Sequence, residues 1–88
     1  SKGTVNASLL SPREVFVQAL KEQASGIMIL HNHPGGNPVP SENDLRITAR
    51  IKEAGLLTDI PLLDHIIIGD NSYFSFKESG LMTQESGS

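Results

Sequence analysis

Hydrophobic positions along the chain predict two amphipathic helices. Apolar residues recur on one helical face over residues 12–24 and again over residues 42–54. Ser11 is the expected cap of the first helix, and Gly55 is expected to close the second in the position after its last turn. The residues of the second helix expected to point inward are Leu45, Ala49, Ile51 and Ala54.

Other segments carry the patterns of strands. Residues 26–30 are apolar at successive positions, which predicts a central strand buried on both faces, and residues 61–69 predict a second central strand. A strand over residues 4–10 precedes them, and a tight turn leads into a final strand over residues 73–76. The order strand, helix, strand, helix, strand, strand predicts an α/β fold, a mixed β-sheet flanked by helices.

Length and composition narrow the class of protein. An 88-residue chain forms one small domain, which we assign to residues 1–82, and the small polar residues 83–88 are expected to be a disordered tail. The net charge of −3, with scattered basic residues, argues against direct nucleic-acid binding. The chain has no cysteine and no apolar stretch near the ~20 residues of a membrane span, so we expect a soluble, cytoplasmic protein.

Two histidines and one aspartate form the candidate metal site. His31 and His33 follow the first central strand at a spacing that projects both imidazoles to the same side of extended backbone. A loop rich in proline and glycine then leads to Asp44, in the first turn of the second helix. Two imidazoles, one carboxylate and an open position are typical of a catalytic zinc site. A facial iron triad uses the same ligand types, although zinc fits best.

Ser41 and Asp44 also have a purely structural interpretation. Serine three residues before an acidic residue is typical of a helix cap, and the helix dipole favours an acid in the first turn. Taken alone, the pair is better explained by capping. Capping does not require His31 or His33, however, and the combination of all four residues favours a metal site.

The same residues carry a family resemblance. His31-Asn32-His33-Pro34, six further residues, Ser41, two residues and Asp44 match the JAMM metalloprotease motif without a gap. Residues 3–8 and 63–67 are similar to the RadC branch of that superfamily, whose members are named as DNA repair proteins. The resemblance extends over residues 3–82 and implies an incomplete domain of the MPN, cytidine deaminase-like fold.

The resemblance also implies a mechanism. Zinc would be held by His31, His33 and Asp44, and zinc-bound water would attack an amide carbonyl while Ser41 stabilises the developing oxyanion. The family motif includes a general-base glutamate on a strand before Gly3, and the glutamates of this chain do not match it. They are Glu14, Glu22, Glu42, Glu53, Glu78 and Glu85.

Two functions follow as alternatives. The first is a zinc-dependent hydrolase of the metallopeptidase or isopeptidase type that acts on a protein or peptide. The second is a non-catalytic interaction module of DNA repair or recombination, and the missing glutamate separates the two. We expect the chain to be a fragment with little activity of its own and with an unpaired sheet edge that favours association between copies.

Asp64 and His65 lie next to each other in the second central strand, so their side chains point to opposite faces of the sheet. As a fourth ligand, His65 would close the metal shell and make the site structural. A buried, hydrogen-bonded His65, or an Asp64 that orients a ligand imidazole, agrees better with an open position.

Overall fold

The computed structural model describes residues 2–8, 11–33 and 35–82, and in this part the elements follow the predicted order. They are β1 (Lys2–Ala7), α1 (Pro12–Lys21), β2 (Ala24–Asn32), α2 (Glu42–Thr58), β3 (Leu62–Ile68) and β4 (Tyr73–Ser75). The sheet order is β1-β2-β3-β4; the first three strands are parallel and β4 is antiparallel to β3. The predicted α/β class with a mixed sheet is confirmed. The predicted tail, residues 83–88, lies outside the described residues, as do the last two residues of the strand predicted over 4–10.

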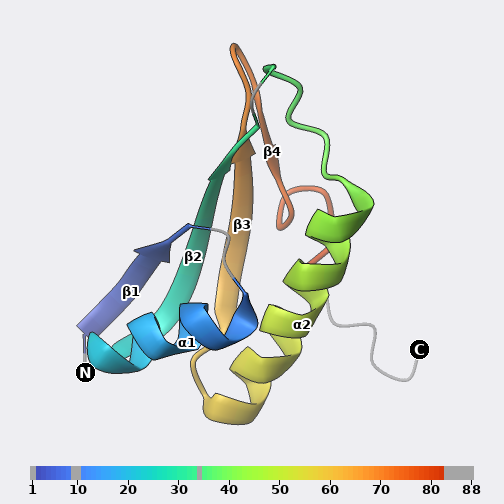
Figure 1. The fold of residues 1–88 in the computed structure, drawn as a ribbon. Helices are drawn as coiled ribbons and strands as arrows, with labels where there is room; N and C mark the ends of the chain where they lie inside the picture. Colours follow the sequence, from blue (N-terminus) through green and yellow to red (C-terminus); the bar gives the residue numbers. More distant parts are fainter. Residues whose placement is uncertain (1, 9–10, 34, 83–88) are drawn as a thin grey trace.

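Both helices pack against one face of the sheet (Figure 1). Ile27 and Ile29 of β2 are fully buried beneath them, in one core with Phe16 of α1. The prediction that this strand is buried on both faces is wrong, because no helix of the described part covers the other face. There Leu30 is 39% exposed and Ile68 is 41% exposed.

The pairing of β2 with β3 contains a one-residue irregularity. Ile27 pairs with Leu62, whereas Met28 pairs with Asp64, so Leu63 is an extra residue on β3. A single extra residue reverses which side chains face each side of the sheet. The irregularity therefore turns His65 toward the helices and Asp64 toward the open face of the sheet.

Local signals fix the start of α1 better than its end. The side chain of Ser11 accepts a hydrogen bond of 3.3 Å from the backbone N–H of Glu14, as expected of the cap. The helix ends at Lys21 rather than at residue 24, because Gln23 adopts a left-handed conformation with φ of 53° and Ala24 already belongs to β2.

The end of α2 also differs from the prediction. The helix continues beyond Gly55 to Thr58, and the left-handed residue that ends it is Asp59, with φ of 60°. Gly55 is buried inside the helix, where a Cβ would lie 2.8 Å from the carbonyl oxygen of Ile60 and 3.1 Å from the backbone nitrogen of Leu62. Glycine is required there because the chain that enters β3 passes directly against the helix.

The buried face of α2 is shifted from the predicted one. Leu45 is 40% exposed, Ala49 is exposed, Ala54 is half-buried, and only Ile51 of the predicted set is fully buried. The buried residues of this helix are Asp44, Thr48, Ile51 and Gly55. The pattern of apolar residues predicts the wrong face because two of the buried positions of this helix carry the polar side chains of Asp44 and Thr48.

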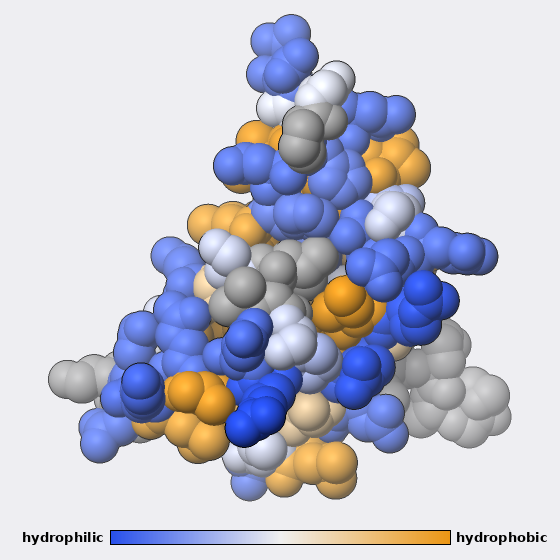
Figure 2. Space-filling model, in the orientation of Figure 1, coloured by the Kyte–Doolittle hydropathy of each residue, from blue (hydrophilic) through white to orange (hydrophobic). Residues whose placement is uncertain are grey.

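The face seen in Figure 2 is covered mainly by polar residues, with hydrophobic residues in separate patches. Among the described helices, none has the length and apolar character needed to cross a membrane. In the described part of the chain β1 pairs only with β2, so its other edge has no strand beside it there.

We predict that Gly55→Ala lowers the free energy of unfolding by about 1 to 3 kcal/mol, because the added Cβ meets backbone atoms that cannot move independently. In a helix free of such contacts the same change would be stabilising by about 1 kcal/mol. Urea unfolding measures the difference. Ala49→Gly, at an exposed position of α2, is the control for helix propensity, and a more stable Gly55→Ala variant would contradict the close approach.

Candidate metal centre

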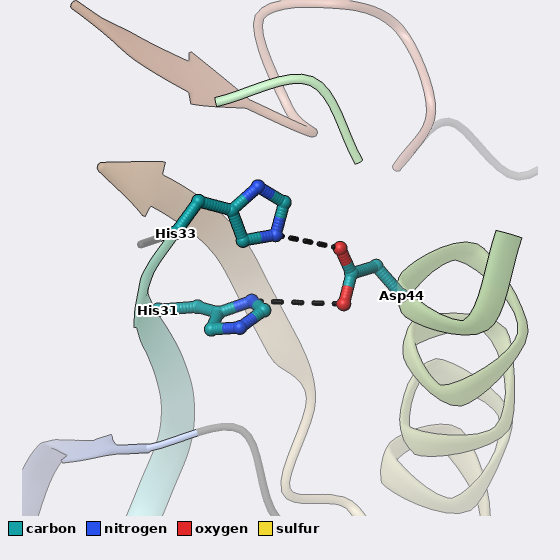
Figure 3. A group of neighbouring side chains, drawn as sticks. All are labelled: His31, His33 and Asp44. Carbon is teal, nitrogen blue, oxygen red and sulfur yellow. Dashed lines mark hydrogen bonds and ion pairs between the residues drawn. The ribbon is translucent and has the colours of Figure 1, made fainter. Parts of the chain in front are cut away.

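His31, His33 and Asp44 come together where β2 ends and α2 begins (Figure 3). His33 Nε2 lies 2.9 Å from Asp44 Oδ2, and His31 Nδ1 lies 3.7 Å from Asp44 Oδ1. One ligand atom from each residue can be chosen so that all three lie within 4.8 Å of one another. The three residues thus form a group that could hold a metal ion.

The backbone carbonyl of Asn37 fixes the orientation of the His33 ring. His33 Nδ1 lies 2.8 Å from this oxygen, which can only accept a hydrogen bond, so Nδ1 carries a hydrogen. The lone pair of a neutral His33 is then on Nε2, the atom that faces the Asp44 carboxylate. Two acceptors at 2.9 Å require a positive charge between them, which either a proton or a metal ion supplies.

The loop after β2 is fixed against the turn between β3 and β4. The backbone N–H of His33 donates to the carbonyl of Ile68, and that of Asp70 donates to the carbonyl of Gly36. A Cβ at Gly69 would clash with the carbonyl oxygen of Gly36, so the two backbones touch. Sequence reasoning did not identify Asn37 or this contact as part of the site. The only local signals were an asparagine before a proline and a glycine after a strand.

Asp44 is both the capping residue and a member of the candidate metal group. Its backbone N–H donates to Ser41 Oγ at 3.0 Å, and the backbone N–H of Ser41 donates to Asp44 Oδ2 at 2.9 Å, which completes a capping box. Asp44 is 4% exposed, and burial opposes its charge. Hydrogen bonds from Ser41 and His33, with the nearby His31, outweigh burial and hold the pKa of this carboxyl below its usual value.

His31 is half-buried and remains neutral more readily than a free histidine. Burial lowers its pKa, the charge of Asp44 opposes this effect, and His33 lowers the pKa further. Its Nδ1 is buried and has no hydrogen-bond partner among the described residues. A neutral imidazole nitrogen left unpaired beside a carboxylate is what a divalent ion needs as a ligand.

The donor set fits a zinc-sized ion. Tetrahedral zinc with nitrogen and oxygen ligands at about 2.0 to 2.1 Å separates those ligand atoms by roughly 3.4 Å. The two histidines approach different oxygens of Asp44, His33 Nε2 at 2.9 Å from Oδ2 and His31 Nδ1 at 3.7 Å from Oδ1, and one ligand atom of each residue lies within 4.8 Å of the other two. The fit therefore rests on the ligand types, two imidazoles and one carboxylate, and these separations would have to adjust around an ion.

His65 lies behind this group and is not part of it. Its side chain is fully buried, and its Nδ1 lies 2.7 Å from Thr48 Oγ1, so the prediction of a buried, hydrogen-bonded histidine is confirmed. Burial, with His31 as the second cause, lowers the pKa of His65 to about 4 against the opposing charges of Asp44 and Asp64. At neutral pH this imidazole is uncharged.

Asp64 forms hydrogen bonds within and beside the sheet and none to a candidate ligand. Its carboxylate accepts hydrogen bonds from the backbone N–H groups of His65 and Lys77 and from the hydroxyl of Ser75. The candidate ligand imidazoles are not among these partners. Asp64 holds the segment after β4 against β3 and does not take the orienting role considered for it.

No glutamate of the described part joins the three candidate ligands. Glu14 stands at the start of α1, where its N–H donates to Ser11. Glu22 accepts a hydrogen bond from Gln18 at the end of that helix, and Glu42 is exposed at the start of α2. These three glutamates therefore lie outside the group that His31, His33 and Asp44 form.

Comparison with known proteins identifies similar sequences over most of the chain. A family profile described as "RadC-like JAB domain" matches residues 1–81. The UPF0758 protein of Alkaliphilus metalliredigens (strain QYMF) is 57% identical over 82 residues, which is 93% of this chain and 35% of the relative. The UPF0758 protein of Pelobacter propionicus is 54% identical over 82 residues, 93% of this chain and 36% of the relative. The chain thus spans about a third of the length of the curated relatives that it matches.

We predict that the metal-free chain becomes less stable as the pH falls from 7.5 to 5. The pKa of His65 is about 4 in the folded chain against 6.5 unfolded, so between these values only the unfolded chain binds the proton. The contribution of the neutral, buried His65 to the free energy of unfolding is therefore complete above about pH 6.5. It is lost as the pH falls from there toward 4, by about 3 kcal/mol in total. The lowered pKa of His31 acts in the same direction, whereas Asp44 acts only at lower pH.

Urea unfolding at the two pH values, with chelator present, measures this loss. In a His65→Gln variant the difference between pH 7.5 and pH 5 should shrink to the part that His31 contributes. An unchanged difference would show that His65 is not the group that titrates.

Proposed function

The chain belongs to the RadC-like JAB domain family, and we propose that it is the zinc-binding core of a JAMM-type hydrolase that cleaves an amide or isopeptide bond. The observation that carries this proposal is the convergence of His31, His33 and Asp44 at the end of β2 and the start of α2. Two neutral imidazoles and one carboxylate are the donor set of a catalytic zinc site. When bound, zinc supplies Lewis-acid activation of water for attack on an amide carbonyl.

The charges of the protein side chains support this chemistry. Asp44 is the one anionic donor, so the group leaves a divalent ion with a net positive charge. The carbonyl of Asn37 keeps a hydrogen on His33 Nδ1 and so leaves Nε2 free to bind the metal. A hydrogen-bonded outer nitrogen also makes a ligand histidine more basic and holds its ring in place.

Ser41 is the residue that we propose to stabilise the developing oxyanion. Its Oγ accepts a hydrogen bond from the backbone N–H of Asp44, which leaves the hydroxyl hydrogen available to donate to another oxygen. The side chain belongs to an exposed residue beside the candidate ligand Asp44. Capping and oxyanion stabilisation are compatible, because the first uses the lone pair of the hydroxyl and the second uses its hydrogen.

Proton transfer requires a further group. We propose that the glutamate of the family motif acts as general base from a segment outside this chain, since no glutamate of the described residues joins the site. Such groups contribute about 10²- to 10⁴-fold to the rate. The hydrolytic activity therefore belongs to the assembled domain and not to the zinc ligands alone.

The zinc site predicts how two charge-removing variants differ. Wild-type chain should bind one zinc ion, and Asp44→Asn, which keeps the shape of the cap, should bind it more than about 100-fold more weakly because it removes a ligand charge. Glu42→Gln removes a negative charge from the same helical turn and should leave the affinity unchanged. Competition with a chromogenic chelator gives the affinities, and repeating it with ferrous iron compares the two metals. Equal zinc uptake by wild type and His33→Ala would refute the site.

The role of Ser41 predicts a separation of catalysis from stability. Ser41→Ala should lower the free energy of unfolding by about 1 kcal/mol and the rate of hydrolysis by about 10²-fold. Ser11→Ala removes the equivalent cap of α1 and should change stability alone. The variants are made in an extended chain, in which the amino-terminal segment of the A. metalliredigens relative precedes this sequence. Hydrolysis is measured on linear peptides and on lysine-branched isopeptides that carry a fluorescent leaving group.

The same assay includes the 88-residue chain without the added segment. Its rate should be about 10²- to 10⁴-fold lower, because the general base is missing. Hydrolysis at the wild-type rate by Ser41→Ala would leave only the capping role. Zinc binding without hydrolysis of any substrate by the extended chain would favour the alternative, a non-catalytic interaction module.

A further inference from the structure

His65 is fully buried between two other rings. It stacks on Phe76, with ring centroids 4.6 Å apart and planes at 4°, and on His31, with centroids 5.7 Å apart and planes at 28°. His31 in turn meets His33 edge to face at 4.7 Å. The four rings form a continuous row from the interior of the domain to the candidate metal group, which we call the ring row.

The inner end of the ring row is held from several sides. Thr48, one turn after Asp44 in α2, lies 2.7 Å from His65 Nδ1, and Thr48 is itself 3% exposed. The backbone N–H of Phe76 donates to the carbonyl of His65 at 3.0 Å, and Phe76 is 2% exposed. The Thr48 bond thus holds the His65 ring itself, while the backbone bond holds Phe76 in place to stack on that ring.

The two candidate ligand histidines are held differently. His33 makes the hydrogen bond to the Asn37 carbonyl that is usual for a metal-binding histidine. His31 makes no such bond among the described residues, since its Nδ1 faces Asp44 at 3.7 Å and has no hydrogen-bond partner. The His31 ring has two ring neighbours: the edge-to-face contact with His33 and the stacked ring of His65, which is itself fully buried and so cannot turn aside.

We propose that His65 is the positioning residue for His31: its ring face sets the plane of the His31 ring so that a nitrogen points at Asp44. The inference rests on the proposed metal site. His65 has no hydrogen bond through Nε2 within the described part, so it acts by its flat face and not as a donor or a ligand. The one-residue irregularity in β3 is what brings this face beneath His31.

The first test uses the metal-free chain and two variants of position 65. His65→Phe keeps a flat ring, and His65→Leu fills the space without one. Proton NMR of the His31 ring should show one set of signals with cross-peaks to ring 65 in wild type and in His65→Phe. In His65→Leu the His31 signals should broaden or divide.

The second measurement is the affinity for Co²⁺, whose visible absorption reports the geometry of its ligands. His65→Phe should bind Co²⁺ within about threefold of wild type with the same spectrum, whereas His65→Leu should bind it about 10- to 100-fold more weakly with an altered spectrum. Urea unfolding of both variants separates this effect from stability. If His65→Leu keeps the wild-type His31 signals and Co²⁺ affinity, the proposal is overturned. The proposal is also overturned if the loss of Co²⁺ affinity in both variants is proportional to their loss of stability.

A variant of Thr48 provides the test if His65→Phe does not fold. Thr48→Val keeps the imidazole and removes only the bond that holds it, so the affinity for Co²⁺ should fall severalfold. Thr58→Val removes a hydroxyl bonded to the carbonyl of Ala54 at the far end of α2 and should leave the affinity unchanged. Equal affinities in the two threonine variants would argue against positioning by His65. If wild-type chain binds no metal, the proposed function fails, while the His31 signals of the metal-free chain still decide the role of His65.

Discussion

The candidate site depends on keeping one buried carboxylate ionised. Asp44 has almost no contact with water, and the loss of hydration alone would favour its neutral form. The charge survives because Ser41, from the same helix cap, and His33, from the end of β2, both bond to it. Holding this carboxylate therefore fixes the start of α2 against the end of the strand, and it places a negative charge where the candidate ligands meet.

The two histidines reach this carboxylate from one strand end but are oriented by different kinds of contact. His33 lies in the irregular segment after the strand, where a backbone carbonyl of the loop is within reach of its ring. His31 is still within β2, where its backbone pairs with β3, and its side chain contacts the rings of His33 and His65. In the loop a hydrogen bond orients His33, whereas in the sheet His31 is oriented by contacts with neighbouring rings.

The three candidate ligands come from one short stretch of sequence, so a chain that spans about a third of the length of its relatives can contain them together. The three candidate ligands lie within residues 31–44, one strand end and one helix start joined by a loop. Support for this stretch comes from three places: the turn after β3, where Gly69 meets Gly36, β3 itself, through the ring of His65, and the segment after β4, through the ring of Phe76. The glutamate that would transfer the proton is proposed to lie outside this chain.

The sequence by itself determined the features that depend on neighbours in the chain. The caps at Ser11 and Ser41 form from residues three positions apart, and the order of strands and helices follows from periodicity. The candidate metal ligands were predictable for the same reason, because the spacing of His31, His33 and Asp44 is a local property of a strand end and a helix start.

Only the tertiary structure decided what depends on contacts between distant segments. Gly55 remains inside α2 because the chain entering β3 passes against it, although locally glycine predicts the end of a helix. The extra residue in β3 turns His65 toward the helices, and strand alternation alone could not locate that irregularity. The Asn37 carbonyl became part of the site through the fold of its loop, since any residue has such a carbonyl and only its position gives it a role.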